Sequence, residues 1–172
     1  MGLKVGEVSL ESYNPAWKDD FLKEKENLVK LMNGTALTIE HIGSTAIPGL
    51  SAKPIIDISV GVNKLTDFNK VKEKFLNFPY SIKEDSPIDE ILIRKGSVNN
   101  RTHFIHVMEI DSPRYKNTLL FRDYLNSNKD ELLKYENLKK ELAEKYHDNR
   151  IMYTSSKNDY ISDILRKANK EL

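Results

Sequence analysis

From Ile39 to Val60 the chain reads IEHIGSTAIPGLSAKPIIDISV, and this segment decides the fold. Apolar and polar residues alternate up to Ile42, and the pattern stops at Gly43–Ser44, which indicates a strand that ends in a tight turn. Backbone N–H groups are free in such a turn, so it is able to hold an anion. A second apolar run then carries Asp57, whose ionised carboxylate is costly to bury without a partner. The segment predicts two strands, an anion-binding turn and a carboxylate with a specific role.

The length and composition set the class of protein. The chain has 172 residues, so we expect one domain that spans 1–172. Lys and Arg total 27 against 26 for Asp and Glu, a balance that gives no bulk attraction to nucleic acid or to a membrane surface. The absence of cysteine excludes disulfides, thiolate metal sites and cysteine nucleophiles. We find neither a membrane span of ~20 apolar residues nor a signal peptide, and we expect a soluble cytoplasmic protein. Composition does not determine its oligomeric state.

Hydrophobic periodicity before and after the central segment predicts further elements. We expect an edge strand over 5–10, and then a helix that begins at Asn14–Pro15 and ends at Asn33–Gly34. A helix capped by Thr66 should follow the central segment. Further strands are expected over 80–83, 91–95 and 102–110.

The C-terminal third of the chain has a helical pattern. We expect helices that begin at Ser112, at Asn128 and near Ser155 or Ser156. No repeat or linker separates this part from the strands, so we expect it to pack on the sheet. The fold class is therefore α+β, with a mixed sheet flanked by helices and a helical C-terminal portion.

Four motifs stand out along the chain. They are Glu40-His41-x-Gly43-Ser44-Thr45-x-x-Pro48-Gly49-Leu50-x-x-Lys53-Pro54-x-x-Asp57, Arg101-x-His103-x-x-His106-Val107, Phe121-Arg122-Asp123-Tyr124-Leu125 and Tyr153-x-x-x-Lys157. These motifs resemble those of the GrpB family, and the likeness covers nearly the whole chain. It implies a core similar to that of the nucleotidyltransferases related to DNA polymerase beta, and hence a nucleotide or other phosphorylated small molecule as ligand.

Asp57 is the first candidate catalytic residue and metal ligand. In a strand it shares a face with Ser59, and the resembled nucleotidyltransferases have two carboxylates at these positions to bind two Mg²⁺ ions. The hydroxyl of Ser59 is a weak ligand, so one ion suffices, another acid replaces the missing one, or transfer has been lost. Glu109 is the candidate for the additional carboxylate, and Mg²⁺ is the expected cofactor. Alternatively, Asp57 only accepts hydrogen bonds from the turn and ties the two strands together.

The resemblance assigns phosphate binding to the turn, and the position of a nearby lysine adds a second candidate for substrate binding. Gly43, Ser44 and Thr45 would hold phosphate groups, although Pro48–Gly49 interrupts any long helix that begins there. Lys53 comes just before the second strand, where its ammonium group is able to reach an anion in the same cleft. A solvated lysine is the ordinary alternative.

The histidines and Arg101 complete the candidate set. Because 102–110 reads as a strand, His103 and His106 point to opposite faces, and we expect the one in the cleft to act as an acid–base group or phosphate donor. A satisfied core histidine is the alternative for each. Arg101 suits phosphate recognition, with exposed charge as its alternative. Glu40 and His41 also alternate, and we expect His41 to face the cleft.

These residues support a leading hypothesis and two alternatives. The first is a phosphoryl- or nucleotidyl-transfer enzyme, or a relic of one, with Asp57, His103 and His106 as catalytic residues. The second is a non-catalytic binding or folding-accessory module, since the resembled family also occurs fused to dephospho-CoA kinase and Ser59 replaces an acid. The third is metal-dependent hydrolysis by the histidines, against which strand alternation argues because it sends them to opposite faces.

Overall fold

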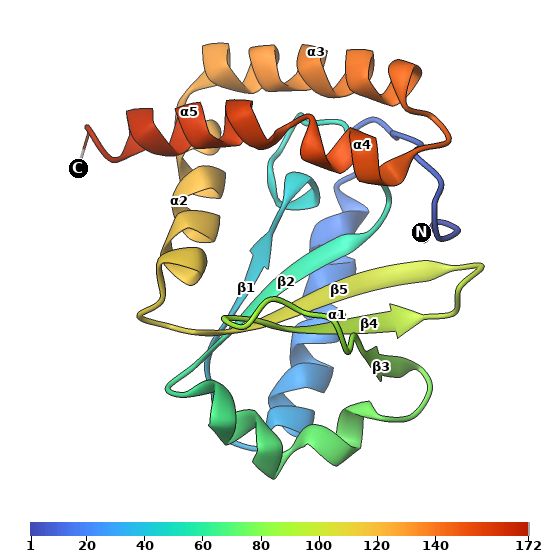
Figure 1. Ribbon diagram of the computed structural model, residues 1–172, viewed down its shortest axis with the longest axis vertical. Helices are drawn as coiled ribbons and strands as arrows, with labels where there is room; N and C mark the ends of the chain where they lie inside the picture. The colour runs from blue at the N-terminus through green and yellow to red at the C-terminus, as the bar shows by residue number, and fades with distance from the viewer. Residues whose placement is uncertain (172) are drawn as a thin grey trace.

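The computed structural model describes residues 1–171 and contains a five-stranded mixed sheet (Figure 1). The strands are β1 (Ala36–Ile42), β2 (Ile56–Val62), β3 (Tyr80–Ile82), β4 (Ile91–Gly96) and β5 (Arg101–Glu109). Their order is β1-β2-β5-β4-β3. The central strands β2 and β5 are parallel, whereas the other neighbouring pairs are antiparallel. A parallel pair needs a long crossover, and here residues 63–100 supply it.

Helices cover the sheet from two directions. They are α1 (Ala16–Met32), α2 (Pro113–Ser127), α3 (Lys129–Lys145), α4 (Arg150–Ser155) and α5 (Asn158–Ala168). Figure 1 shows α1 behind the sheet, whereas α3, α4 and α5 gather beyond one end of it and α2 runs along the β1 side. Within residues 1–171, none of the helices is long and apolar enough to cross a membrane.

The main core lies between the sheet and α1. Ile58 and Val60 of β2 and Ile105 of β5 are fully buried, and they belong to one cluster with Trp17 and Leu28 of α1. Because side chains alternate along a strand, these residues commit one face of the sheet to α1. Asp57 and His106 must then lie on the other face, toward the C-terminal helices.

A second cluster attaches the C-terminal helices to the segment between β1 and β2. Ile47 and Leu50 of that segment are buried against Leu125, Tyr135 and Ile164. Apolar contact of this kind holds the helices near the sheet without fixing their rotation.

Hydrogen bonds fix the orientation of the C-terminal helices relative to the sheet. Ser51 donates its backbone N–H and its hydroxyl to Glu136, at 2.9 and 2.6 Å, and Lys139 donates to the Ser51 carbonyl. Arg122 of α2 similarly donates to the carboxylate of Glu40, at 3.2 Å, and to the carbonyl of His41, at 2.9 Å. These contacts fix α2 and α3 relative to β1 and to the start of β2.

The predicted α+β class, with its mixed sheet and helical C-terminal portion, is confirmed. The helix expected from Asn14–Pro15 is α1, whose first N–H groups include that of Ala16, bonded to Asn14 Oδ1 at 3.0 Å. It ends at Asn33, which adopts the left-handed conformation.

Two expectations about elements were wrong, and one short helix was not foreseen. Residues 5–10 form no strand, because the pairing near this segment is limited to isolated bridges of Leu3 with Arg101 and of Glu11 with Ala52. The helix expected from Thr66 consists of two 3₁₀ helices, Leu65–Lys70 and Lys72–Phe75, whose tighter winding suits the three-residue spacing of buried Phe68 and Val71. The last helical region contains the separate α4 before α5.

The central strand should be the most sensitive part of the core. We expect Ile58→Ala to lower the free energy of unfolding by about 2–5 kcal/mol, because it leaves a cavity between β2 and α1. Leu37→Ala on β1 is the control, since Leu37 is exposed and its loss should cost less than about 0.5 kcal/mol. Chemical denaturation measures both. Similar losses for the two variants would contradict this assignment of the core.

Candidate functional site

A pocket of about 710 Å³ lies between the sheet and the C-terminal helices. Its floor is formed by the end of β1, the start of β2 and the face of β5 that carries His106. Its walls come from α2, α3, α4 and α5, which contribute both apolar and basic side chains. The volume is in the range of small-molecule sites.

The turn at Gly43 sets the shape of the floor. Gly43 has φ 68° and ψ −172°, a conformation that glycine adopts far more easily than other residues, and it leads into the single 3₁₀ turn Ser44–Ala46. A Cβ atom at Gly43 would lie 2.6 Å from Oδ2 of Asp57. Glycine is therefore needed both for the backbone conformation and for the close approach of the Asp57 carboxylate.

Asp57 lies beside a histidine that has a second acidic partner. His106 Nδ1 is 2.5 Å from Oε1 of Glu90, and His106 Nε2 is 3.7 Å from Oδ1 of Asp57. Burial opposes protonation of the ring, but the two carboxylates outweigh it and raise the pKa of His106 to about 9. The ring is thus an imidazolium at neutral pH, and each of its N–H groups faces a carboxylate.

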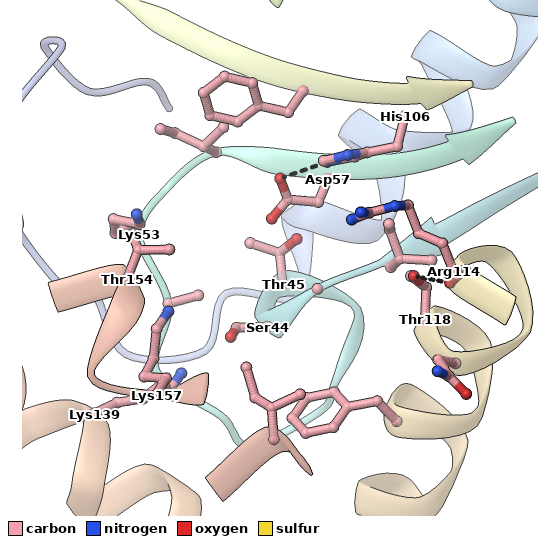
Figure 2. Close-up of a pocket in the computed structure, with 18 of the residues that line it drawn as sticks. Ser44, Thr45, Lys53, Asp57, His106, Arg114, Thr118, Lys139, Thr154 and Lys157 are labelled. Carbon is pink, nitrogen blue, oxygen red and sulfur yellow. Dashed lines mark hydrogen bonds and ion pairs between the residues drawn. The ribbon is translucent and has the colours of Figure 1, made fainter. Parts of the chain in front are cut away.

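Asp57, Asp89 and Glu90 form the acidic side of the pocket, and Arg114 of α2 pairs with two of them. Its Nε donates to Oδ2 of Asp89 at 2.9 Å, and its Nη1 lies 3.5 Å from Oε2 of Glu90. The positive charges of Arg114 and His106 are therefore matched by Asp89 and Glu90. Figure 2 shows Arg114 and Thr118 on one side of the pocket, with Asp57 and His106 on its floor.

The opposite side is cationic (Figure 2). It carries Lys53, Lys139 and Lys157 together with Arg150 of α4. In the described part of the chain, no carboxylate lies within 4 Å of Lys53, Arg150 or Lys157, so none of the three forms an ion pair. Lys53 and Lys157 instead lie 5.2 and 4.4 Å from the ring centre of buried Tyr153.

Burial, with a smaller contribution from neighbouring positive charges, lowers the pKa values of these lysines. Burial, with the neighbouring charges of Arg150 and Lys157, lowers the pKa of Lys53 to about 7. Burial likewise lowers the pKa of Lys157 to about 8 and that of Lys139 to about 7. Asp57 raises the pKa of Lys53 and of Lys157 but does not offset the burial. An anion in this part of the pocket would supply the missing negative charge.

Four of the residues expected in the cleft lie elsewhere. His41 turns to the α1 side, where its ring stacks on Phe21 and its Nε2 lies 2.9 Å from the hydroxyl of Thr45. Burial lowers its pKa to about 4. The preceding residue of the strand, Glu40, points to the other face, toward the C-terminal helices, and forms an ion pair with Arg122. The expectation that His41 faces the cleft was therefore wrong, because β1 places the opposite set of side chains there.

His103, Arg101 and Glu109 are also remote from the pocket. His103 is buried on the α1 face, and burial lowers its pKa to about 4. Arg101 is buried at the β4–β5 turn and donates to the carbonyl of Gly96 at 2.9 Å. Glu109 accepts from the N–H of Leu65 at 3.0 Å, at the far end of β5 from Asp57. The structure thus brings Asp57, His106, Lys53 and the Gly43–Thr45 turn together, whereas the other four candidates lie outside the pocket.

The donor set does not fit a two-ion magnesium site. Ser59 is fully buried, and its hydroxyl has no hydrogen-bond partner in the described structure. Asp89 and Glu90 form close ion pairs with Arg114 and His106. The ion pair of Asp57 with His106 is longer, at 3.7 Å. Among residues 1–171 no group of three His, Cys, Asp or Glu side chains is arranged to bind a metal ion. Mg²⁺ prefers several oxygen ligands, and one carboxylate with a buried hydroxyl does not supply them.

Several pocket residues were missed from the sequence. Glu90 and Arg114 lie outside the recognised motifs, and Lys139 reads as an ordinary exposed lysine of an amphipathic helix. Arg150 likewise has no local signal. Lys157 was part of the motif Tyr153-x-x-x-Lys157, and that spacing places the lysine over the tyrosine ring. The motif was therefore a signal that could have identified Lys157.

Together these features define an α+β protein with a cationic pocket between its sheet and its C-terminal helices. A family model described as GrpB protein matches residues 7–167. The chain is 37% identical to the glutamate-rich protein GrpB of Alkalihalophilus pseudofirmus, over 97% of this chain and 99% of that protein. The chain belongs to the GrpB family.

Structural comparison agrees with this assignment. The crystal structure of conserved protein GrpB from Enterococcus faecalis matches with a TM-score of 0.86 and 33% identity, over 95% of this chain and 98% of that chain. The chain is also similar to the dephospho-CoA kinase of Mycolicibacterium paratuberculosis, with 24% identity over 94% of this chain and 46% of that protein.

Replacing Gly43 should disturb both the backbone and the carboxylate. We expect Gly43→Ala to lower the free energy of unfolding by about 1–3 kcal/mol and to displace Asp57, because the new methyl group meets its oxygen. Gly49→Ala is the matched control, since Gly49 has a similarly positive φ of 85° but open space at its Cβ position. Chemical denaturation of both variants should show the larger loss at Gly43. An equal loss would mean that the contact with Asp57 contributes nothing.

The charge of His106 should depend on Glu90. In an NMR titration we expect a pKa of about 9 for His106 in the wild type and a lower pKa in Glu90→Gln. Because the folded-state pKa lies above the ordinary value of 6.5, the protonated ring stabilises the native state below about pH 6.5, and this contribution is lost as the pH rises through about 9. Glu84→Gln, in the loop between β3 and β4, is the control and should leave the titration of His106 unchanged.

Proposed function

We propose that the pocket binds a phosphorylated small molecule, of which a nucleotide is the leading candidate. The observation that carries the proposal is the presence of three basic residues, Lys53, Arg150 and Lys157, in one pocket without ion pairs in the described structure. All three residues are half-buried, and charge that is partly removed from water without a partner is costly unless a ligand supplies the opposite charge.

The rest of the pocket suits a molecule with an apolar or aromatic part. Phe121 of α2 and Tyr135 of α3 are in T-shaped contact at 5.4 Å, and both line the cavity together with Ile161 and Leu165 of α5. A base or another flat group would contact these side chains while the phosphate groups lie near the lysines. The turn at Ser44 would add backbone N–H groups on the phosphate side.

Phosphoryl or nucleotidyl transfer is the reaction that this arrangement supports best. The basic residues would stabilise the negative charge that develops on the transferred group. Asp57, on the pocket floor, would accept the proton of an attacking hydroxyl, and the imidazolium of His106 would hold its carboxylate in position. Incubation with radiolabelled nucleoside triphosphates, followed by chromatography, tests turnover directly.

A second candidate is a non-catalytic accessory module. Two observations favour it: Ser59 stands where a second acid would be expected, and the chain resembles part of a dephospho-CoA kinase. A module of this kind would bind the anion but show no turnover with any nucleotide. Anion binding without turnover in the labelling experiment therefore selects this candidate over the transferase.

Removing a pocket lysine should weaken binding of phosphorylated ligands. We expect Lys53→Gln and Lys157→Gln each to raise the Kd for ATP by about tenfold or more, since a hydrogen bond to a charged group contributes about 1.5–3 kcal/mol. Lys70→Gln is the matched control, because it removes the same charge from an exposed site on the 3₁₀ helix Leu65–Lys70. Isothermal titration calorimetry measures the three constants. Equal affinities for all variants would place the ligand outside this pocket.

A further inference from the structure

One side of the pocket is acidic and the other is basic. This arrangement determines which groups are available to neutralise a phosphate ligand. On the acidic side, Glu90 and Asp89 are already matched by His106 and Arg114. The sheet adds Asp57, whereas Ser59 in the same strand is neutral. Among the described lining residues, a divalent cation that bridges protein and phosphate would therefore find one carboxylate, Asp57, whose single ion pair is the 3.7 Å contact with His106.

The basic side supplies the charge that a divalent cation would otherwise bring. Lys53 comes from the segment before β2, Arg150 from α4 and Lys157 from the turn between α4 and α5. Lys139 of α3 lines the same side and is anchored by the Ser51 carbonyl. Figure 2 shows the three lysines on the side of the cavity opposite Arg114, and the charge of Arg150 acts on Lys53 and Lys157. A divalent cation placed among them would be repelled by each.

We infer that this pocket binds polyphosphate groups without a divalent cation, by means of Lys53, Arg150 and Lys157, and that Asp57 acts as a counter-charge to these groups instead of a metal ligand. This inference rests on the proposed function, because it specifies how the same site recognises its ligand. It differs from the two-ion site that the nucleotidyltransferase resemblance implies.

The charge balance also specifies the class of ligand. Three basic residues without ion pairs face one carboxylate, so a diphosphate or triphosphate group complements the pocket better than a phosphate monoester does. Tripolyphosphate and pyrophosphate should accordingly bind more tightly than inorganic phosphate. Because Lys53 and Lys157 lose protons more readily than ordinary lysines, the bound anion should also draw protons onto them, and affinity should rise as the pH falls from about 9 to about 7.

The effect of Asp57→Asn on affinity separates the two modes of recognition. If Asp57 is only a counter-charge, its removal leaves the lysines less neutralised, and pyrophosphate should bind with unchanged or greater affinity. If Asp57 holds a bridging metal ion, the same substitution should abolish the metal-dependent binding. Asp85→Asn is the matched control, because it removes an equal charge from an exposed loop that does not line this pocket.

The experiment is isothermal titration calorimetry of wild type, Asp57→Asn, Asp85→Asn and Lys157→Gln with pyrophosphate and tripolyphosphate, each in EDTA and in excess Mg²⁺. Circular dichroism first establishes that each variant is folded, and a thermal-shift series relative to each variant's own ligand-free state repeats the comparison. We expect wild type to bind in EDTA, Asp57→Asn to bind at least as tightly, and Lys157→Gln to bind about tenfold more weakly or worse.

The possible outcomes separate this inference from the proposed function. Binding that requires Mg²⁺ and disappears in Asp57→Asn would overturn the inference while leaving the proposed function intact. A Kd in EDTA that is tenfold higher for Asp57→Asn than for Asp85→Asn would overturn it as well. Absence of binding by wild type in both EDTA and Mg²⁺ would refute the inference and the proposed function together.

Discussion

The parallel pairing of β2 with β5 is the constraint on which the rest of the structure depends. In this register Ile58 lies opposite Ile105, so both apolar side chains turn to α1 and enter the main core. A shift by one residue would exchange the two faces and move these side chains into the pocket. The same register fixes Asp57 and His106 on the other face. The hydrophobic core and the charged pocket are therefore two consequences of one strand alignment.

The C-terminal helices convert this charged face into an enclosed site. Burial of Leu125, Tyr135 and Ile164 against Ile47 and Leu50 is the main favourable contribution to their docking. The Ser51–Glu136 hydrogen bonds then fix the orientation of α3. Docking in this orientation brings basic side chains close together, which is unfavourable on its own. Apolar burial offsets that repulsion, and this is how a pocket with depressed lysine pKa values is kept in a folded protein.

Position on the sheet explains which sequence hypotheses gained structural support. The alternation of His103 and His106 between faces was foreseen from the strand pattern, and it argued correctly against a simple metal pair of histidines. The prediction for His41 failed because strand alternation shows that only one of Glu40 and His41 faces the cleft, but it does not show which one. Glu109 was grouped with Asp57 by residue type, whereas the register places it at the far end of β5. The roles proposed for Asp57, His106, Lys53 and the turn stay predictions.

The sequence by itself determined the strand that ends at Gly43, the carboxylate within an apolar run, the α+β class and the family to which the motifs assign the chain. Each depends on residues that are close in the chain, where periodicity and turn chemistry act. Only the tertiary structure decided that Glu90 is the partner of His106, and that Lys53 shares a pocket with Lys157. These pairs are far apart in sequence, and their proximity follows from strand order and from apolar docking of the helices. No local pattern encodes that docking, because a lysine on a helix has the same sequence signal whether it faces solvent or a ligand site.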